Sequence, residues 1–162
     1  MSITRRLALA GAASLGLLFA SPAFAGATIA VSLWDQGGDM STTSNLGYNM
    51  GGDMSQATMG IDVSPNTVSA GHVTFLVTNA SSDTIHEMVV APLASQDEVL
   101  PYVVDQNRVD EDGAKSLGEV SELEPHAAGE LGINLKPGTY ILYCNIPGHY
   151  ASGMWAILNV TQ

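Results

Sequence analysis

The sequence predicts an all-β fold, a Greek-key β-sandwich or barrel of about seven to eight strands. Three observations support this prediction. Short runs alternate apolar and polar residues, turns rich in Gly, Pro and Asn separate these runs, and we find no convincing long amphipathic helix. Alternation places one face of a strand in a core, and many short strands joined by such turns are typical of a sandwich.

In the first half of the chain, three strands can be placed. Residues 27–33 alternate apolar and polar side chains and form the first strand. Residues 71–79 are the clearest strand of the sequence, with Phe75 at the centre of the apolar face. Residues 85–91 form a third, continuously apolar strand.

Three more strands follow in the second half. Residues 129–135 alternate, Pro137 and Gly138 form a turn, and strands follow at 139–143 and 154–160. Short helices are candidates in the region between the two halves, at 97–104 or 115–123.

The first 25 residues have the features of a signal peptide. A basic start precedes an apolar run over 7–19, and Ala23 and Ala25 form an A-x-A cleavage site. The basic start leaves general secretory and twin-arginine export both open. Cleavage after about Ala25 would leave 162 − 25 = 137 residues, enough for one domain. No further segment is long and apolar enough to span a membrane, so we expect a periplasmic monomer with no membrane insertion.

Within the mature chain, two parts are expected. Residues 26–60 hold the first strand and a flexible segment rich in Met, and residues 61–162 form the main domain.

The mature chain is strongly acidic. All 16 carboxylates follow residue 25 against only three basic residues, which gives a net charge of 3 − 16 = −13. Such a charge repels nucleic acid and favours a basic protein partner, for example one similar to cytochrome c. A copper-handling protein is the alternative partner. Seven carboxylates gather between residues 105 and 124, where they form either a solvated loop or a docking patch. They are Asp105, Asp110, Glu111, Asp112, Glu119, Glu122 and Glu124.

The most informative motif lies near the C-terminus. Cys144, His149 and Met154 follow the pattern C-x4-H-x4-M. A thiolate, an imidazole and a thioether form a soft ligand set that suits copper cycling between Cu(I) and Cu(II), whereas Met is a poor zinc ligand. His86, at the start of an apolar run, is the best candidate for a second imidazole. Proline and glycine within the loop are expected to hold His149 where its ring reaches solvent.

The single cysteine is consistent with this interpretation. One Cys in an exported chain cannot form an internal disulfide, and a free thiol in an oxidising compartment is exposed to oxidation. Metal ligation would protect Cys144, whereas the alternative is a buried, inert side chain.

The segment YCNIPGHYASGM, followed by an apolar strand, resembles the ligand loop of the type 1 (blue) copper proteins, the cupredoxins. Its spacing is closer to the azurin, rusticyanin and sulfocyanin branches than to plastocyanin, and the resemblance covers about residues 60–162. The stretch SSDTIHEMVVAPL is similar to periplasmic cupredoxins associated with copper tolerance. The resemblance implies one copper ion with His86, Cys144 and His149 as equatorial ligands and Met154 as the axial ligand.

One position departs from the family pattern. Many cupredoxins have Asn directly after the first His, where it bonds across to the Cys loop, but this sequence has Glu87. A carboxylate beside the copper ligands would lower the potential or make it depend on pH.

Four methionines precede the main domain in GGDMSTTSNLGYNMGGDMSQATMG. They are Met40, Met50, Met54 and Met59. Because thioethers select Cu(I), a flexible segment could capture cuprous ion. The alternative is a mobile linker whose Met side chains pack against the domain.

Other copper centres and catalytic sites are excluded by composition. The binuclear centre of cytochrome oxidase subunit II needs two cysteines, and a copper nitrite reductase needs a second domain and more His ligands. No hydrolytic constellation is found, and we expect His72 and His126 to be exposed polar residues.

The expected function is that of a periplasmic mononuclear type 1 copper protein in copper tolerance or handling, with one-electron redox chemistry. It would not be an enzyme, apart from weak oxidation of cuprous ion. The alternative is an electron carrier to a cytochrome, oxidase or reductase.

Overall fold

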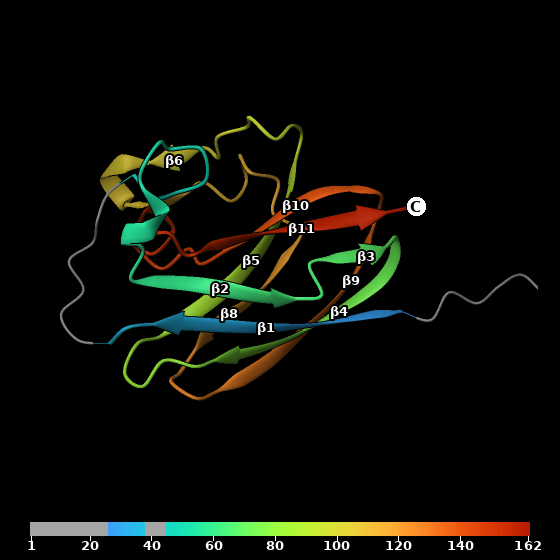
Figure 1. Ribbon diagram of the computed structural model, residues 1–162, viewed down its shortest axis with the longest axis horizontal. Coiled ribbons are helices and arrows are strands. Elements are labelled where there is room, and N and C mark those ends of the chain that lie inside the picture. Colours follow the sequence, from blue (N-terminus) through green and yellow to red (C-terminus); the bar gives the residue numbers. More distant parts are fainter. Residues whose placement is uncertain (1–25, 38–44) are drawn as a thin grey trace, which may run out of the picture.

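Two β-sheets pack face to face in the computed structural model, which describes residues 26–37 and 45–162 (Figure 1). The predicted signal peptide and Met40 lie outside the described residues. The first sheet has the strand order β2 (Met59–Ser64), β1 (Ala27–Asp35), β4 (Gly71–Asn79) and β9 (Ala128–Leu135). The second has the order β3 (Thr67–Ser69), β11 (Trp155–Thr161), β10 (Gly138–Tyr143), β5 (His86–Leu93) and β8 (Gly118–Leu123).

Shorter elements join these strands. A two-stranded pair is formed by β6 (Tyr102–Val103) and β7 (Arg108–Val109). Single turns of 3-10 helix are η1 (Met54–Gln56), η2 (Val104–Gln106) and η3 (Tyr150–Ser152). Among the described residues, we find no helix that could cross a bilayer.

The predicted all-β sandwich is confirmed, but both helix candidates are wrong. Residues 118–123 form β8, which pairs antiparallel with β5 and buries Val120 opposite Met88. Residues 97–104 contain no helix except Val104, where η2 begins. Pairing with β5 decides the conformation of β8, because local propensity is weak beside burial against a neighbouring strand.

The main core lies between the two sheets. Alternate residues of β1 and β4 point into it, as the sequence predicts, and Met88, Val90, Leu142 and Leu158 of the second sheet meet them. A second apolar cluster covers the opposite face of the second sheet, where Val89, Ala91 and Ile141 pack with Tyr143 and Tyr150. The continuous apolar run of β5 is therefore explained by burial on both faces.

Strand pairing brings three predicted ligands to one end of the second sheet. Tyr143, the last residue of β10, lies opposite Val89 of β5 and Trp155 of β11. Cys144 therefore follows β10, Met154 precedes β11 and His86 begins β5 at the same end of the sandwich.

Candidate metal centre

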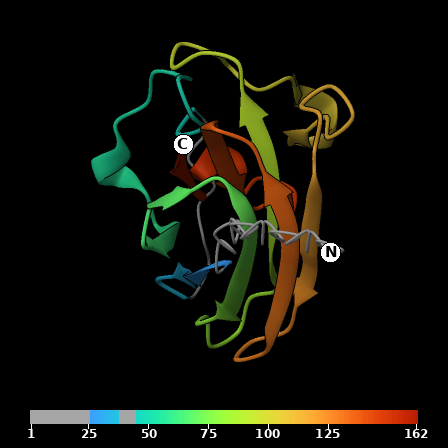
Figure 2. The same ribbon diagram turned by 90° about the vertical axis from the view of Figure 1, so that its right-hand side faces the viewer.

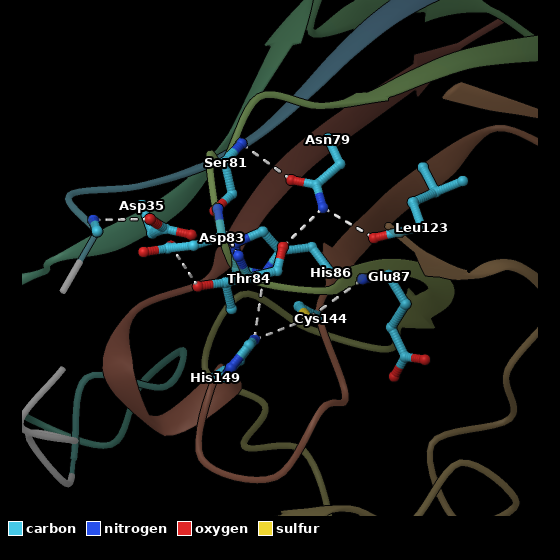
Figure 3. A network of polar contacts seen from close by, with 11 residues as sticks. Asp35, Asn79, Ser81, Asp83, Thr84, His86, Glu87, Leu123, Cys144 and His149 are labelled. Atoms are coloured by element: carbon cyan, nitrogen blue, oxygen red, sulfur yellow. Dashed lines mark hydrogen bonds and ion pairs between the residues drawn. The ribbon is translucent and has the colours of Figure 1, made fainter. Parts of the chain in front are cut away.

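The side chains of His86, Cys144 and His149 form a compact triangle (Figure 3). The two Nδ1 atoms of the histidines are 3.2 Å apart, and Sγ of Cys144 lies 3.3 Å from Nδ1 of His149. All three ligand atoms lie within 4.8 Å of one another. One ion with metal–nitrogen bonds of about 2 Å could contact all three atoms.

A polar turn between β4 and β5 positions His86. Buried Asn79 donates hydrogen bonds from Nδ2 to the carbonyl oxygens of Thr84 and Leu123, both at 2.8 Å. Its Oδ1 accepts the backbone N–H of Ser81, whose hydroxyl oxygen accepts the N–H of Thr84 at 2.9 Å. These bonds fix the chain immediately before His86 and tie it to β8.

The ligand loop, residues 144–154, is closed by its own backbone. The N–H of Cys144 donates to the carbonyl of Met154, and the N–H of Met154 donates to the carbonyl of His149, both at 3.1 Å. Gly148 and Gly153 have φ of 89° and 100°, which side-chain-bearing residues rarely adopt, so these two glycines permit the tight path. The predicted axial ligand Met154 is fully buried in the main core beside Cys144.

Residues 45–58, here called the covering segment, pack on the ligand loop. The N–H of Leu46 donates to the carbonyl of Ala151 at 2.8 Å, and the carbonyl of Leu46 accepts the indole N–H of Trp155 at 2.7 Å. His149 is only 7 % exposed. His149 is therefore largely buried, against the expectation that its ring reaches solvent, and the covering segment packs on Ala151 and Gly153 of the same loop.

The family model of the Sulfocyanin (SoxE) domain matches residues 40–162. This chain belongs to that family. The comparison with curated protein sequences returned no match.

Two solved structures show the same cupredoxin fold. Auracyanin B is 20 % identical, with 90 % of this chain and 94 % of that chain covered and a TM-score of 0.53. Rusticyanin from Thiobacillus ferrooxidans is 19 % identical, with 85 % and 80 % covered and a TM-score of 0.52. The family match and the His–Cys–His triangle together identify a cupredoxin-type electron-transfer protein with one type 1 copper site.

The electrostatics of the triangle suit a soft cation. Burial and the neighbouring His86 lower the pKa of His149 to about 4, and burial also lowers the pKa of His86. Both rings are therefore neutral and keep a lone pair for a metal. Burial raises the pKa of the Cys144 thiol to about 12, so the thiol carries its proton in the absence of a metal. A metal that binds Cys144 must displace this proton, as metals do at other thiolate sites. Two neutral imidazoles and a sulfur favour copper over hard cations such as Mg²⁺ or Ca²⁺.

Glu87 takes the place of the usual Asn, and its carboxylate accepts a hydrogen bond from the backbone N–H of Asn145 in the Cys loop. Its backbone N–H points at Sγ of Cys144, 3.4 Å away, but its carboxylate points away from the sulfur (Figure 3). The side chain of Asn145 also ties down the Cys loop, because it bonds to the N–H and carbonyl of Val109 and to Glu111. Burial, together with Glu119 and Glu111, raises the pKa of Glu87 to about 7.

Of the four candidate methionines, the three that the structure describes are not gathered into one site. Met59 begins β2 and is buried in the main core, whereas Met50 packs against the second cluster. Met54 is 42 % exposed on η1. His72 and His126 are both exposed, as predicted.

Three residues around the site were missed from the sequence. Asp35 contacts His86 from 51 positions away, and Asn79 and Asn145 anchor the two ligand-bearing segments. The two asparagines could have been noticed in the sequence, because Asn79 ends a strand and Asn145 follows one. No sequence pattern linked Asp35 to His86.

Proposed function

We propose that this cupredoxin is a periplasmic one-electron carrier, with copper held by His86, Cys144 and His149 and with Met154 as the axial ligand. The single observation that supports this most strongly is the buried triangle of two imidazole nitrogens and a sulfur. Bound copper would supply a centre that accepts and returns one electron. The chain holds the ligands from three strands and a loop closed by its own hydrogen bonds, which limits rearrangement between oxidation states.

A basic redox partner would dock on the acidic segment, residues 105–124. The N–H of Gly148 in the ligand loop donates to the carbonyl of Asn107 at 2.7 Å, so this segment lies beside the loop. Figure 2 shows η1 and η2 on opposite sides of the molecule, with the red C-terminal part of the chain between them. The covering segment thus flanks one side of the loop, while exposed carboxylates such as Asp105 and Asp110 flank the other.

The docking proposal can be tested with a basic cytochrome c as the probe. Stopped-flow rates of electron transfer would be measured over a range of salt concentrations for D105N/D110N. The expected result is a slower reaction at low salt and a flatter salt dependence, because steering falls with ionic strength. Asp62, an exposed acid on β2, provides the control D62N. Equal behaviour of the two variants would contradict docking at residues 105–124.

Copper tolerance is the second candidate function, in which the methionines capture Cu(I) and the type 1 site oxidises it. The exposed thioether of Met54 supports this candidate, whereas the burial of Met59 leaves fewer thioethers free for capture.

Counting copper equivalents separates the two candidates. Cu(I) and Cu(II) would be titrated separately into the mature protein while the visible spectrum is recorded. One coloured equivalent alone favours a carrier. Additional colourless Cu(I) that is lost in M40L/M54L favours copper handling, and M59L is the matched control because Met59 lies in the core.

A further inference from the structure

His86 carries a second, outer contact that the copper site itself does not require. Its Nε2 lies 2.7 Å from Oδ2 of Asp35, and the two side chains are 0 % and 1 % exposed. Asp35 is the last residue of β1, so the contact joins the first sheet to the start of β5 in the second. The other oxygen, Oδ1, accepts the backbone N–H of Gly37 at 2.7 Å.

The direction of this hydrogen bond determines which nitrogen of His86 is free. An ionised carboxylate only accepts hydrogen bonds, so the proton of a neutral ring must lie on Nε2. The lone pair is then on Nδ1, the atom that faces His149 at 3.2 Å. Among the described residues, no carboxylate makes a comparable contact with His149, so the two histidines are held differently.

The surroundings of Asp35 suit a charged carboxylate. Its two oxygens face the backbone N–H of Gly37 and the ring of His86, both at 2.7 Å, and an ionised carboxylate accepts such hydrogen bonds strongly. A negative charge hydrogen-bonded to a ligand imidazole increases the electron density that the ring donates to a metal. Such an anion stabilises Cu(II) more than Cu(I), because Cu(II) carries the larger charge.

We propose that Asp35 is a positioning residue for the copper site, which fixes the Nε2–H tautomer of His86 and lowers the reduction potential. The chain thereby forms a carboxylate–imidazole–copper arrangement on one of its two histidines only. The alternative is that Asp35 and His86 merely clasp the two sheets together, with no effect on the ligand.

The substitution D35N tests this proposal, because it removes the charge and keeps the shape. Cu(II) affinity is expected to fall about 10- to 100-fold, the usual effect of losing an outer partner of a ligand. If Cu(I) affinity falls about tenfold less than Cu(II) affinity, the potential rises by about 59 mV. The control is D83N, which removes an exposed carboxylate three positions before His86 that does not contact the ring. D83N should leave the potential close to that of the wild type.

A second measurement separates positioning from clasping and does not require the variant to fold. A long-range ¹H–¹⁵N spectrum of the Cu(I)-loaded, full-length wild type reports which nitrogen of His86 carries the proton. A slowly exchanging proton on Nε2 supports the proposal, and a proton on Nδ1 overturns it. If D35N folds and loses stability with an unchanged potential and an unchanged Nε2–H signal, Asp35 is a clasp only and the proposal is wrong.

Discussion

The contact between the covering segment and the ligand loop can be tested at Gly153. An ideal Cβ built on this residue would lie 2.8 Å from Cβ of Ala57 and 3.3 Å from Cε of Met54. Because Ala57 has no flexible side chain to move aside, G153A must displace the backbone of the covering segment or of the loop. Overpacking of this kind costs about 1–3 kcal/mol.

The backbone adds a second cost at Gly153. Its φ of 100° is unfavourable for a residue with a Cβ by about 1–2 kcal/mol. We therefore expect G153A to lower the free energy of unfolding by about 2–5 kcal/mol in total.

Gly51 provides a matched control for the backbone cost. Its φ is 87°, and a Cβ there would meet no atom within 4 Å. G51A should therefore lose only about 1–2 kcal/mol. Urea unfolding followed by circular dichroism gives both values. The fluorescence of Trp155 reports on the cover directly, because its indole donates to Leu46. Equal destabilisation of the two variants, with unchanged Trp155 fluorescence in G153A, would refute close packing of the covering segment on the loop.

Three further predictions concern the site itself. C144S should abolish the intense thiolate-to-copper charge-transfer colour, and a variant that remains coloured in visible spectra would contradict the role of Cys144. M154L should keep copper and raise the potential measured by redox titration, by about 60 mV for each tenfold loss in relative Cu(II) affinity, whereas an unchanged potential argues against an axial thioether. In the metal-free protein, the raised pKa of Glu87 gives stability that is fully present below its ordinary pKa of 4.5 and is lost as pH rises to about 7. E87Q should remove this loss of unfolding free energy, which is about 1–2 kcal/mol after allowance for solvent screening. If the free energies of unfolding of E87Q and the wild type, measured with urea, change with pH in parallel, the prediction is wrong.

Much of the fold could be predicted because alternation reports burial directly. The residues of β1, β4 and β9 alternate along their length, and each predicted strand was found there. β8 was missed because only Val120 is buried among polar neighbours, so the segment has no apolar face of its own. Its conformation depends on hydrogen bonding to β5, which no local pattern records.

The candidate site could be predicted in part for a similar reason. Cys144, His149 and Met154 lie in one loop, so their spacing carries geometric information, and His86 was the best remaining imidazole. The contact of Asp35 with His86 and the burial of His149 depend on segments brought together only by the packing of the two sheets. Such long-range contacts leave no periodic trace in the sequence.

The covering segment also bears on how quickly the metal enters and leaves. The ligand triangle is buried, and residues 45–58 are hydrogen-bonded to the loop that carries His149. Because the ligands are buried, an incoming ion must wait for the chain around them to open locally, and a bound ion must wait for the same event to escape. Affinity depends on the ligands, but the loading and loss half-times depend on the free energy of this opening. A cover of this kind lets a protein retain its metal through many redox cycles even where competing chelators bind copper as tightly.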